Sequence, residues 1–235
     1  MHYLELTLST PAENLACDEV LLEWCENGGA CEILRFWESS EYFVTLGYTN
    51  RVAEEVHENR DIPILRRCSG GGTVLQGPGC FNYSLILRVA QDGPTASVTG
   101  ANEFIMQRHH DALQTLLPNG ITVEGHTDLA CDGRKFSGNA QRRKQKFFLF
   151  HGTFLLDFDL PLIERVLRSP PKQPEYRQNR KHTDFVMNLP LSQDEITNAL
   201  RRVWNANEPL QDFPRGRMLE LAEEKYSSDD WNLKF

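Results

Sequence analysis

Residues 66–75 read Arg-Arg-Cys-Ser-Gly-Gly-Gly-Thr-Val-Leu and lie between apolar runs that predict two strands. Three consecutive glycines remove side chains, so backbone N–H groups can face a ligand, and a phosphate or carboxylate suits that lining. A plain hairpin turn is the alternative. The adjacent arginines favour anion binding, because guanidinium groups pair readily with phosphate oxygens. Neither G-x-x-x-x-G-K-[ST] nor a G-x-G-x-x-G opening a helix is present, so this is not a familiar nucleotide loop.

A second segment, residues 127–140, reads Thr-Asp-Leu-Ala-Cys-Asp-Gly-Arg-Lys-Phe-Ser-Gly-Asn-Ala. Its Asp132-Gly133 pair predicts a tight hairpin turn, which places Lys135 at the start of the returning strand with Ser137 on the same face. A lysine held on a strand can meet a carboxylate or phosphoryl oxygen as negative charge builds there. A solvated surface lysine is the alternative, and the flanking glycines make it less attractive here.

The rest of the chain predicts an α+β fold, a mixed sheet with helices packed on it. Thr10, Pro11 and Glu13 form a capping box with proline at the first helical position, so we expect a helix from there to about residue 26. Strands are expected at 32–37, 42–46, 62–65, 73–75, 82–89, 121–124, 128–132, 135–142 and 147–156. Further helices are expected at 97–117, 192–206 and 214–225, with an extended connector at 169–180.

Composition excludes several classes of protein. The net charge of -8 argues against a dedicated nucleic-acid binder, which needs a concentrated basic face. No secretion signal and no run of about 18 apolar residues is present, so we expect a cytoplasmic protein with no membrane span. The six cysteines are scattered without close C-x-x-C pairs, which favours reduced thiols.

Four stretches together resemble one family. Residues 66–85 are similar to the R-R-x-S-G-G-G-A-V signature of lipoate-protein ligase A and its relatives. Residues 128–141, followed by 151–160, resemble that family's D-L-x-x-(N/D)-G-(R/K)-K-x-S-G-x-A and H-G-T-L-L signatures, and residues 34–50 contain its R-F-W region. The chain is therefore identified as a lipoate-protein ligase A-like member of the biotin/lipoate protein ligase and octanoyltransferase family, over about residues 1–160.

The resemblance implies the biotin/lipoate ligase catalytic fold, with ATP and Mg²⁺ as co-substrates and lipoate as substrate. The acid is activated as its acyl-adenylate and then passed to a lysine of an acceptor lipoyl domain or a glycine-cleavage H-type protein. By motif position Lys135 contacts both the acid carbonyl and the α-phosphate. The substrate- and nucleotide-binding positions so implied are Arg67, Ser69, Gly70, Gly71, Gly72, Thr73, Val74, Leu75, Asn82, Asp128, Ser137, Gly138, Ala140, Gly152 and Thr153.

Some positions keep two interpretations. Asp128 is a candidate Mg²⁺ or adenylate contact or an ordinary carboxylate at a strand end, and His151 is expected to be structural rather than a general base. Gln76-Gly77 replaces the family's usual His-Asp. We expect one catalytic domain over 1–235, with a core at 1–190 and a C-terminal helical segment at 191–235. The accessory domain of larger ligases is not expected, which suggests a separate partner chain or a reaction without adenylation.

Two other functions compete with the ligase. An ATP-independent transferase would move octanoyl or lipoyl groups between carrier proteins through a cysteine thioester. Cys131 is the candidate nucleophile and Cys68 a weaker one, although strand alternation turns Cys131 inward, and a buried thiol is inert. A non-catalytic lipoate-binding protein is the third hypothesis.

The residues from Arg134 to Lys146 include six basic and no acidic side chains. This run is either a solvated face or a docking patch for an acidic acceptor.

Overall fold

The computed structural model describes residues 1–29, 32–57, 61–117, 120–170 and 172–235, and it contains two sheets. The main mixed sheet has the strand order β11-β1-β2-β6-β10-β9-β8-β7, and a smaller sheet has the order β4-β3-β5. The strands are β1 (His2–Glu5), β2 (Ile33–Glu38), β3 (Phe43–Leu46), β4 (Ile64–Arg66), β5 (Val74–Gln76), β6 (Cys80–Arg88), β7 (Ile121–Glu124), β8 (Asp128–Cys131), β9 (Arg134–Arg143), β10 (Phe147–Leu155) and β11 (Glu208–Pro209).

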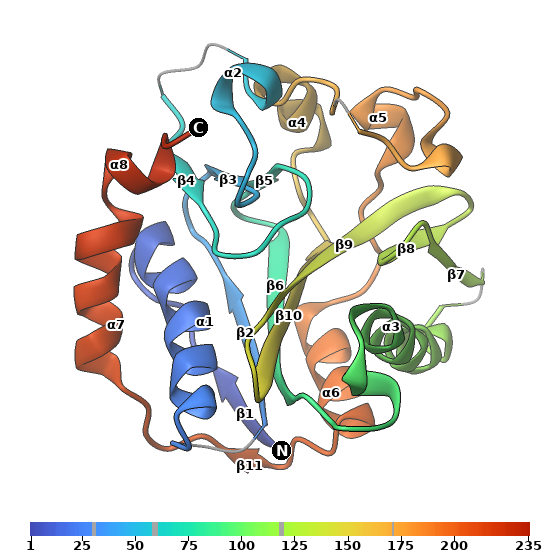
Figure 1. The fold of residues 1–235 in the computed structure, drawn as a ribbon. Coiled ribbons are helices and arrows are strands. Elements are labelled where there is room, and N and C mark those ends of the chain that lie inside the picture. Colours follow the sequence, from blue (N-terminus) through green and yellow to red (C-terminus); the bar gives the residue numbers. More distant parts are fainter. Residues whose placement is uncertain (30–31, 58–60, 118–119, 171) are drawn as a thin grey trace.

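Helices cover both faces of the main sheet (Figure 1). The α-helices are α1 (Pro11–Glu26), α2 (Val52–Glu55), α3 (Val98–Gln114), α4 (Leu160–Val166), α5 (His182–Phe185), α6 (Gln193–Val203), α7 (Arg215–Leu221) and α8 (Asp229–Asn232). Helices α3 and α6 pack on one face around an aromatic core, and α1 and α7 pack on the other. The small sheet shares a third core with α4 and α5. The described part of the chain therefore has three cores, one on each face of the main sheet and one at the small sheet.

The predicted α+β class is confirmed, and most predicted elements lie within a few residues of their expected ends. Helix α1 begins at Pro11 with both hydrogen bonds of the Thr10 capping box. The helix predicted at 97–117 ends at Gln114, and the Pro118-Asn119 stop lies outside the described residues. Strands β1 and β11 and helices α2, α4, α5 and α8 were not predicted, because most have only two to four residues and carry too few periodic positions.

The C-terminal segment packs against the rest of the chain. Helix α7 contacts α1, and Lys225 after it forms an ion pair with Glu19 of α1 at 2.6 Å. Helix α8 lies against β4, where Asn232 accepts a hydrogen bond from the Arg66 backbone N–H. The boundary predicted at residue 190 stays a prediction. No helix in the described part of the chain is long and apolar enough to cross a membrane.

Buried His109 predicts acid-sensitive stability. It is fully buried, its Nε2 accepts a hydrogen bond from Trp204 of the α6 C-terminus, and burial lowers its pKa to about 3. The unfolded chain therefore binds more protons than the folded chain below the usual pKa of about 6.5. Stability should be complete above about pH 6.5 and fall by about 2 kcal/mol at pH 5.

Urea unfolding of the wild type and His109→Gln at pH 8 and pH 5 checks this expectation. The variant should be less stable at pH 8 but should lose less of its free energy of unfolding on acidification. Exposed His57→Gln is the control and should follow the wild type. An unchanged pH slope in His109→Gln would contradict the assignment.

Candidate active site

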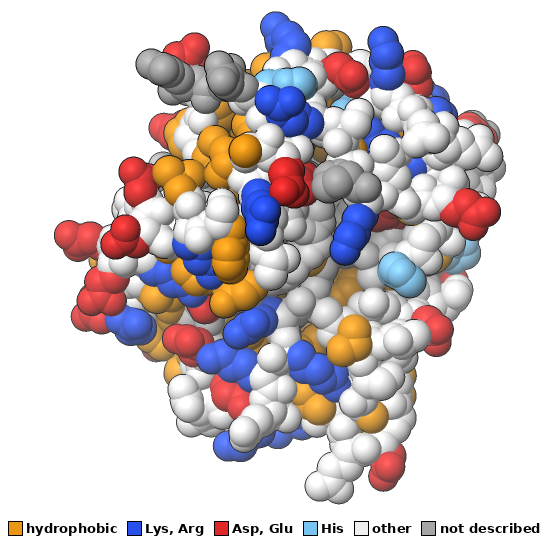
Figure 2. Space-filling model, turned by 45° about the horizontal axis from the view of Figure 1, so that its top comes forward, with side chains coloured by type: hydrophobic (Ala, Val, Ile, Leu, Met, Phe, Trp, Pro, Cys, Tyr) orange, Lys and Arg blue, Asp and Glu red, His pale blue; other side chains and the backbone are white. Residues whose placement is uncertain are grey.

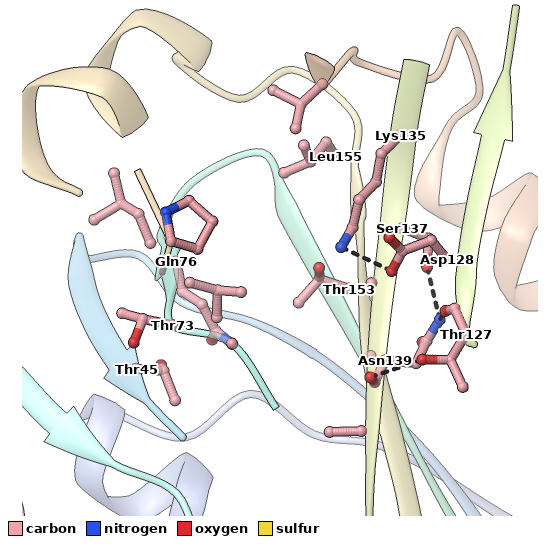
Figure 3. Close-up of a pocket in the computed structure, with 18 of the residues that line it drawn as sticks. Thr45, Thr73, Gln76, Thr127, Asp128, Lys135, Ser137, Asn139, Thr153 and Leu155 are labelled. Atoms are coloured by element: carbon pink, nitrogen blue, oxygen red, sulfur yellow. Dashed lines mark hydrogen bonds and ion pairs between the residues drawn. The ribbon is translucent and has the colours of Figure 1, made fainter. Parts of the chain in front are cut away.

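A cavity of about 820 Å³ lies between the main sheet and the small sheet (Figure 3). Strands β6, β9 and β10 line it from the main sheet, and residues of β3 and β5 line it from the small sheet. The connector beyond α4 closes part of its edge with Arg168, Pro170, Lys172 and Pro174. This volume is in the range of small-molecule sites.

Strand register decides which side chains face the cavity. Cross-strand partners project from the same face of a sheet. One row of partners across β2, β6, β10 and β9 is Trp37, Asn82, Thr153 and Gly138, and the next is Arg35, Ser84, His151 and Ala140. Every one of them except Arg35 lines the cavity.

A β-bulge turns Lys135 onto this cavity face. Leu129 of β8 pairs with Ser137, but Ala130 pairs with Lys135, so Phe136 is an extra residue in β9. Phe136 lies in the α3/α6 core, and Ser137 pairs with Phe154 of that same core. The prediction that Ser137 shares the face of Lys135 is therefore wrong, because simple alternation cannot anticipate an inserted residue. Ser137 still borders the cavity.

Lys135 is held by a carboxylate and a tyrosine. Its Nζ lies 2.8 Å from Asp128 Oδ1, and the Tyr176 hydroxyl donates to Asp128 Oδ2 at 2.7 Å. The Lys135 side chain is 28% exposed, so a ligand in the cavity can reach it. Backbone bonds fix the start of the strand, since the Met187 N–H donates to the Lys135 carbonyl at 2.9 Å.

Gly138 provides the space that the lysine occupies. A Cβ at position 138 would lie 2.6 Å from Lys135 Nζ and 2.7 Å from Cε. The end of the lysine side chain therefore crosses directly over this glycine. Position 152 requires glycine for a different reason. A Cβ there would collide with the Asn139 side chain, which accepts a hydrogen bond from Tyr83.

The two arginines of the glycine loop bind backbone carbonyls. Arg67 donates to the carbonyl oxygens of Gly70 and Gly72 at 2.6 and 2.8 Å, and burial lowers its pKa to about 10. Arg66 is fully buried, and its guanidinium donates to carbonyl oxygens of residues 47–50 and of the C-terminal segment. The expectation that both arginines face an anion is wrong for Arg66, which does not line the cavity. Arg67 lines it while holding the loop in shape.

Ser69 anchors the loop to the main sheet. Its Oγ accepts from Arg67 Nε at 3.0 Å and lies 2.6 Å from His151 Nε2. His151 Nδ1 lies 3.6 Å from Asp18 Oδ2, and Asp18 also binds Ser84 and Arg35. Burial opposes ionisation of Asp18, but the Arg35, His151 and Ser84 contacts outweigh it and lower the pKa of Asp18. This network agrees with a structural role for His151.

The cavity gathers most of the predicted substrate-binding positions. Those that line it are Arg67, Gly72, Thr73, Val74, Leu75, Asn82, Asp128, Lys135, Ser137, Gly138, Ala140, Gly152 and Thr153. Ser69, Gly70 and Gly71 do not line it; Ser69 is fully buried, and Gly70 and Gly71 are exposed. Ligand contact by any of these residues stays a prediction. Sequence reasoning missed Asp18, Thr45, Glu55 and Tyr176, which reach the site only through the tertiary fold.

Neither candidate nucleophile reaches the cavity. Cys131 is 6% exposed and belongs to the α3/α6 core, and burial raises its pKa. Burial also raises the pKa of Cys68 to about 12. Among the described residues no cysteine lines the cavity, and Cys31 lies outside them.

Comparison with known proteins assigns the fold to a family. The family model of the lipoyl protein ligase A/B catalytic domain matches residues 10–200. The chain belongs to this family. A provisionally named lipoate-protein ligase A from Aeropyrum pernix is 31% identical over 218 residues, covering 89% of this chain and 76% of that protein. The octanoyltransferase LipM of Halalkalibacterium halodurans is 26% identical, with 95% of each chain covered.

Solved structures give the same lipoyl-ligase fold. A lipoate-protein ligase A bound with ATP has a TM-score of 0.79 and 25% identity, covering 99% of this chain and 98% of that one. A bi-partite lipoate protein ligase from Thermoplasma acidophilum has a TM-score of 0.82 and 24% identity, covering 99% and 95%. The predicted family, its catalytic fold and the prediction of an enzyme are confirmed. Both ligases and octanoyltransferases are among the relatives, so the family alone does not decide between the two reactions.

Tyr176 is expected to position Lys135 through Asp128. Tyr176→Phe removes the donor to Asp128 Oδ2, so the carboxylate is free to rotate away from Lys135. We expect kcat for acid transfer to fall roughly tenfold, the size of one lost hydrogen bond to a charged group, with KM for the acid little changed. Steady-state kinetics measure both constants. Tyr42→Phe is the matched control, because Tyr42 directly precedes β3 and does not line the cavity, so kcat should stay unchanged. A rise in KM for the acid with no fall in kcat would contradict a positioning role for Tyr176.

Proposed function

We propose that this protein is an ATP-dependent lipoate-protein ligase, which activates lipoate or octanoate as the acyl-adenylate and transfers the acyl group to a lysine of a lipoyl-domain acceptor. The proposal rests on one observation. Lys135 is fixed on the wall of a ligand-sized cavity, whereas no cysteine of the described residues lines that wall. A thioester mechanism needs an accessible thiol, whereas adenylation needs cationic groups at the reacting oxygens and no thiol.

The proposed reaction has two steps. A carboxylate oxygen attacks the α-phosphorus of ATP, the bond to the β-phosphate oxygen breaks, and pyrophosphate leaves. The acceptor amine then attacks the acyl carbonyl carbon, the bond to the AMP oxygen breaks, and the amine loses a proton. Negative charge gathers on the acid and α-phosphate oxygens in both steps, and Lys135 can stabilise both.

Cationic groups in the lining of the same cavity suit the phosphates. Arg177 lines the cavity and is only 4% exposed, yet its Nη2 has no hydrogen-bond partner among the described residues. A buried guanidinium donor without a partner is costly, and a phosphate oxygen would satisfy it. Lys172 lies at the same edge of the cavity. The similarity to an ATP-bound ligase supports this assignment.

Asp128 fits poorly as a Mg²⁺ ligand. Lys135 occupies one of its oxygens and Tyr176 the other, so a metal ion would have to displace a cation already in place. No group of three His, Cys, Asp or Glu side chains in the described ranges could hold a metal. We therefore derive no step through Asp128 and expect Mg²⁺ to enter with ATP, mostly through its phosphates.

The acceptor is proposed to be a lipoyl domain or a glycine-cleavage H-type protein. The basic run at 134–146 is only partly available for docking, because Lys144 pairs with Glu23 and Arg143 donates to the Thr95 carbonyl. Arg142 lies over the Tyr48 ring, and Lys234 lies over the same ring at 3.8 Å. Figure 2 shows several basic side chains on the face in view, with acidic side chains among them. A separate accessory chain is also proposed, since the Thermoplasma acidophilum relative is bi-partite.

Exchange of labelled pyrophosphate into ATP tests the proposal. The protein, with lipoate, ATP and Mg²⁺ but no acceptor, should catalyse the exchange, and a Cys68→Ser/Cys131→Ser variant should retain it. The octanoyltransferases among the relatives make acyl transfer the second candidate. An octanoyl group trapped on the wild type but not on the variant, without exchange, would establish that reaction. Tight lipoate binding with neither signal would indicate the non-catalytic alternative.

A further inference from the structure

Three buried polar atoms in the cavity wall lack a hydrogen-bond partner. They are Trp37 Nε1, Thr45 Oγ1 and Gln76 Oε1. Trp37 is 3% exposed, Thr45 is fully buried and Gln76 is 6% exposed. Buried polar atoms in folded proteins nearly always have partners, so three without them in the lining of one cavity point to a ligand that supplies the bonds.

Thr45 and Gln76 belong to the same face of the small sheet. In the antiparallel pair β3–β5, Gln76 is opposite Phe43, two residues before Thr45, so the two polar side chains are diagonal neighbours. Figure 3 shows both on the side of the cavity opposite Lys135. The same side of the cavity also carries the Thr73 hydroxyl and the Leu75 side chain.

The proposed reaction fixes which end of the acid reaches these atoms. With its carboxylate at Lys135, an acid that extends across the cavity places its far end at the small sheet. A plain alkyl end would leave the Thr45 hydroxyl and the Gln76 carbonyl without partners. A dithiol end can donate S–H groups and accept hydrogen bonds at sulfur, and a cyclic disulfide can only accept.

We propose that Thr45 and Gln76 are specificity-determining residues that select an acid with sulfur groups at its far end over a straight-chain alkanoic acid. The inference rests on the proposed function for the direction of the bound acid. Thr45 can donate to a disulfide or exchange hydrogen bonds with a thiol, and the Gln76 carbonyl accepts only from a thiol. The two residues therefore contribute differently to the two redox forms.

Calorimetric titration without ATP, using lipoate, dihydrolipoate and octanoate, tests the inference. The wild type should bind both sulfur-containing acids roughly tenfold more tightly than octanoate, the expected effect of one satisfied polar group. Thr45→Val should weaken both redox forms about tenfold and leave octanoate unchanged. Gln76→Leu should weaken the binding of dihydrolipoate more than that of lipoate. Thr45→Ser keeps the hydroxyl and should retain the preference for the sulfur-containing acids over octanoate.

Two results would overturn the inference. One is equal affinity of the wild type for all three acids, or equal loss for all three in Thr45→Val and Gln76→Leu. The other is found by pyrophosphate exchange: a raised KM for ATP in these variants, with unchanged affinities for the three acids, would place the nucleotide at these residues. Because binding is measured without ATP, failure of adenylation would leave acid selection visible, so the two proposals can fail separately. Thermal unfolding identifies a variant that has lost its fold.

Discussion

Replacing Lys135 by alanine is expected to slow lipoate attachment about 10²- to 10³-fold, the usual cost of one charge-stabilising group at a reacting oxygen. The lysine is the cation that the strand places on the cavity face, and Asp128 holds its ammonium group at 2.8 Å. Its removal should affect both adenylation and transfer, because both gather charge at the same oxygens. Mass-spectrometric measurement of acceptor lipoylation gives the overall rate, and pyrophosphate exchange isolates the first step.

Lys146→Ala is the matched control for this loss. Lys146 is an exposed lysine at the β9–β10 turn and does not line the cavity, so the variant should keep its activity. Circular dichroism and thermal unfolding should show both variants folded. Pyrophosphate exchange by Lys135→Ala at the wild-type rate would remove the lysine from the chemistry.

Gly138→Ala is expected to lower activity about 10²-fold with little effect on stability. The added methyl group would lie within 2.7 Å of Lys135 Nζ and Cε, and the end of a flexible side chain moves away at small cost. The fold would therefore survive while the ammonium group leaves its position. Displacement of a reacting group by about 1 Å can cost a rate of this size.

Gly216→Ala provides the control, since a Cβ at that position in α7 meets nothing within 4 Å. It should stay fully active and gain about 0.5 to 1 kcal/mol of stability, because alanine is the better helix former. Full activity of Gly138→Ala would mean that catalysis does not require the Lys135 ammonium group to lie over residue 138. Loss of stability instead of activity would show that Gly138 serves packing alone.

Much of the fold could be predicted because its signals are local. The Thr10 capping box determines where α1 begins, and runs of aliphatic and aromatic residues mark β2, β6 and β10. The short elements β1, α2 and α8 carry too few residues for a periodic pattern. They are stabilised by distant partners, such as Asn232 of α8 with Arg66, which no local pattern records.

Site residues that stand together in one sequence segment could be predicted. Those that only the tertiary fold brings to the cavity could not. Lys135 could be singled out from its segment, but the bulge at Phe136 reverses the expected relation between Lys135 and Ser137. Arg66 looked like an anion ligand because its guanidinium is cationic, yet backbone carbonyls occupy it. Tyr176, 48 residues from Asp128 in sequence, gave no signal.

The central claim is that ATP activates the acid in this cavity. The most direct test traces a carboxylate oxygen of the acid into AMP. Lipoate labelled with ¹⁸O in its carboxylate is incubated with ATP, Mg²⁺, the protein and a lipoyl-domain acceptor, and the AMP is analysed by mass spectrometry. In the proposed reaction a carboxylate oxygen bonds to the α-phosphorus and stays there when the amine attacks the acyl carbon. Each AMP should therefore carry one ¹⁸O for each acceptor modified. Acceptor modification with no ¹⁸O in AMP would contradict the account.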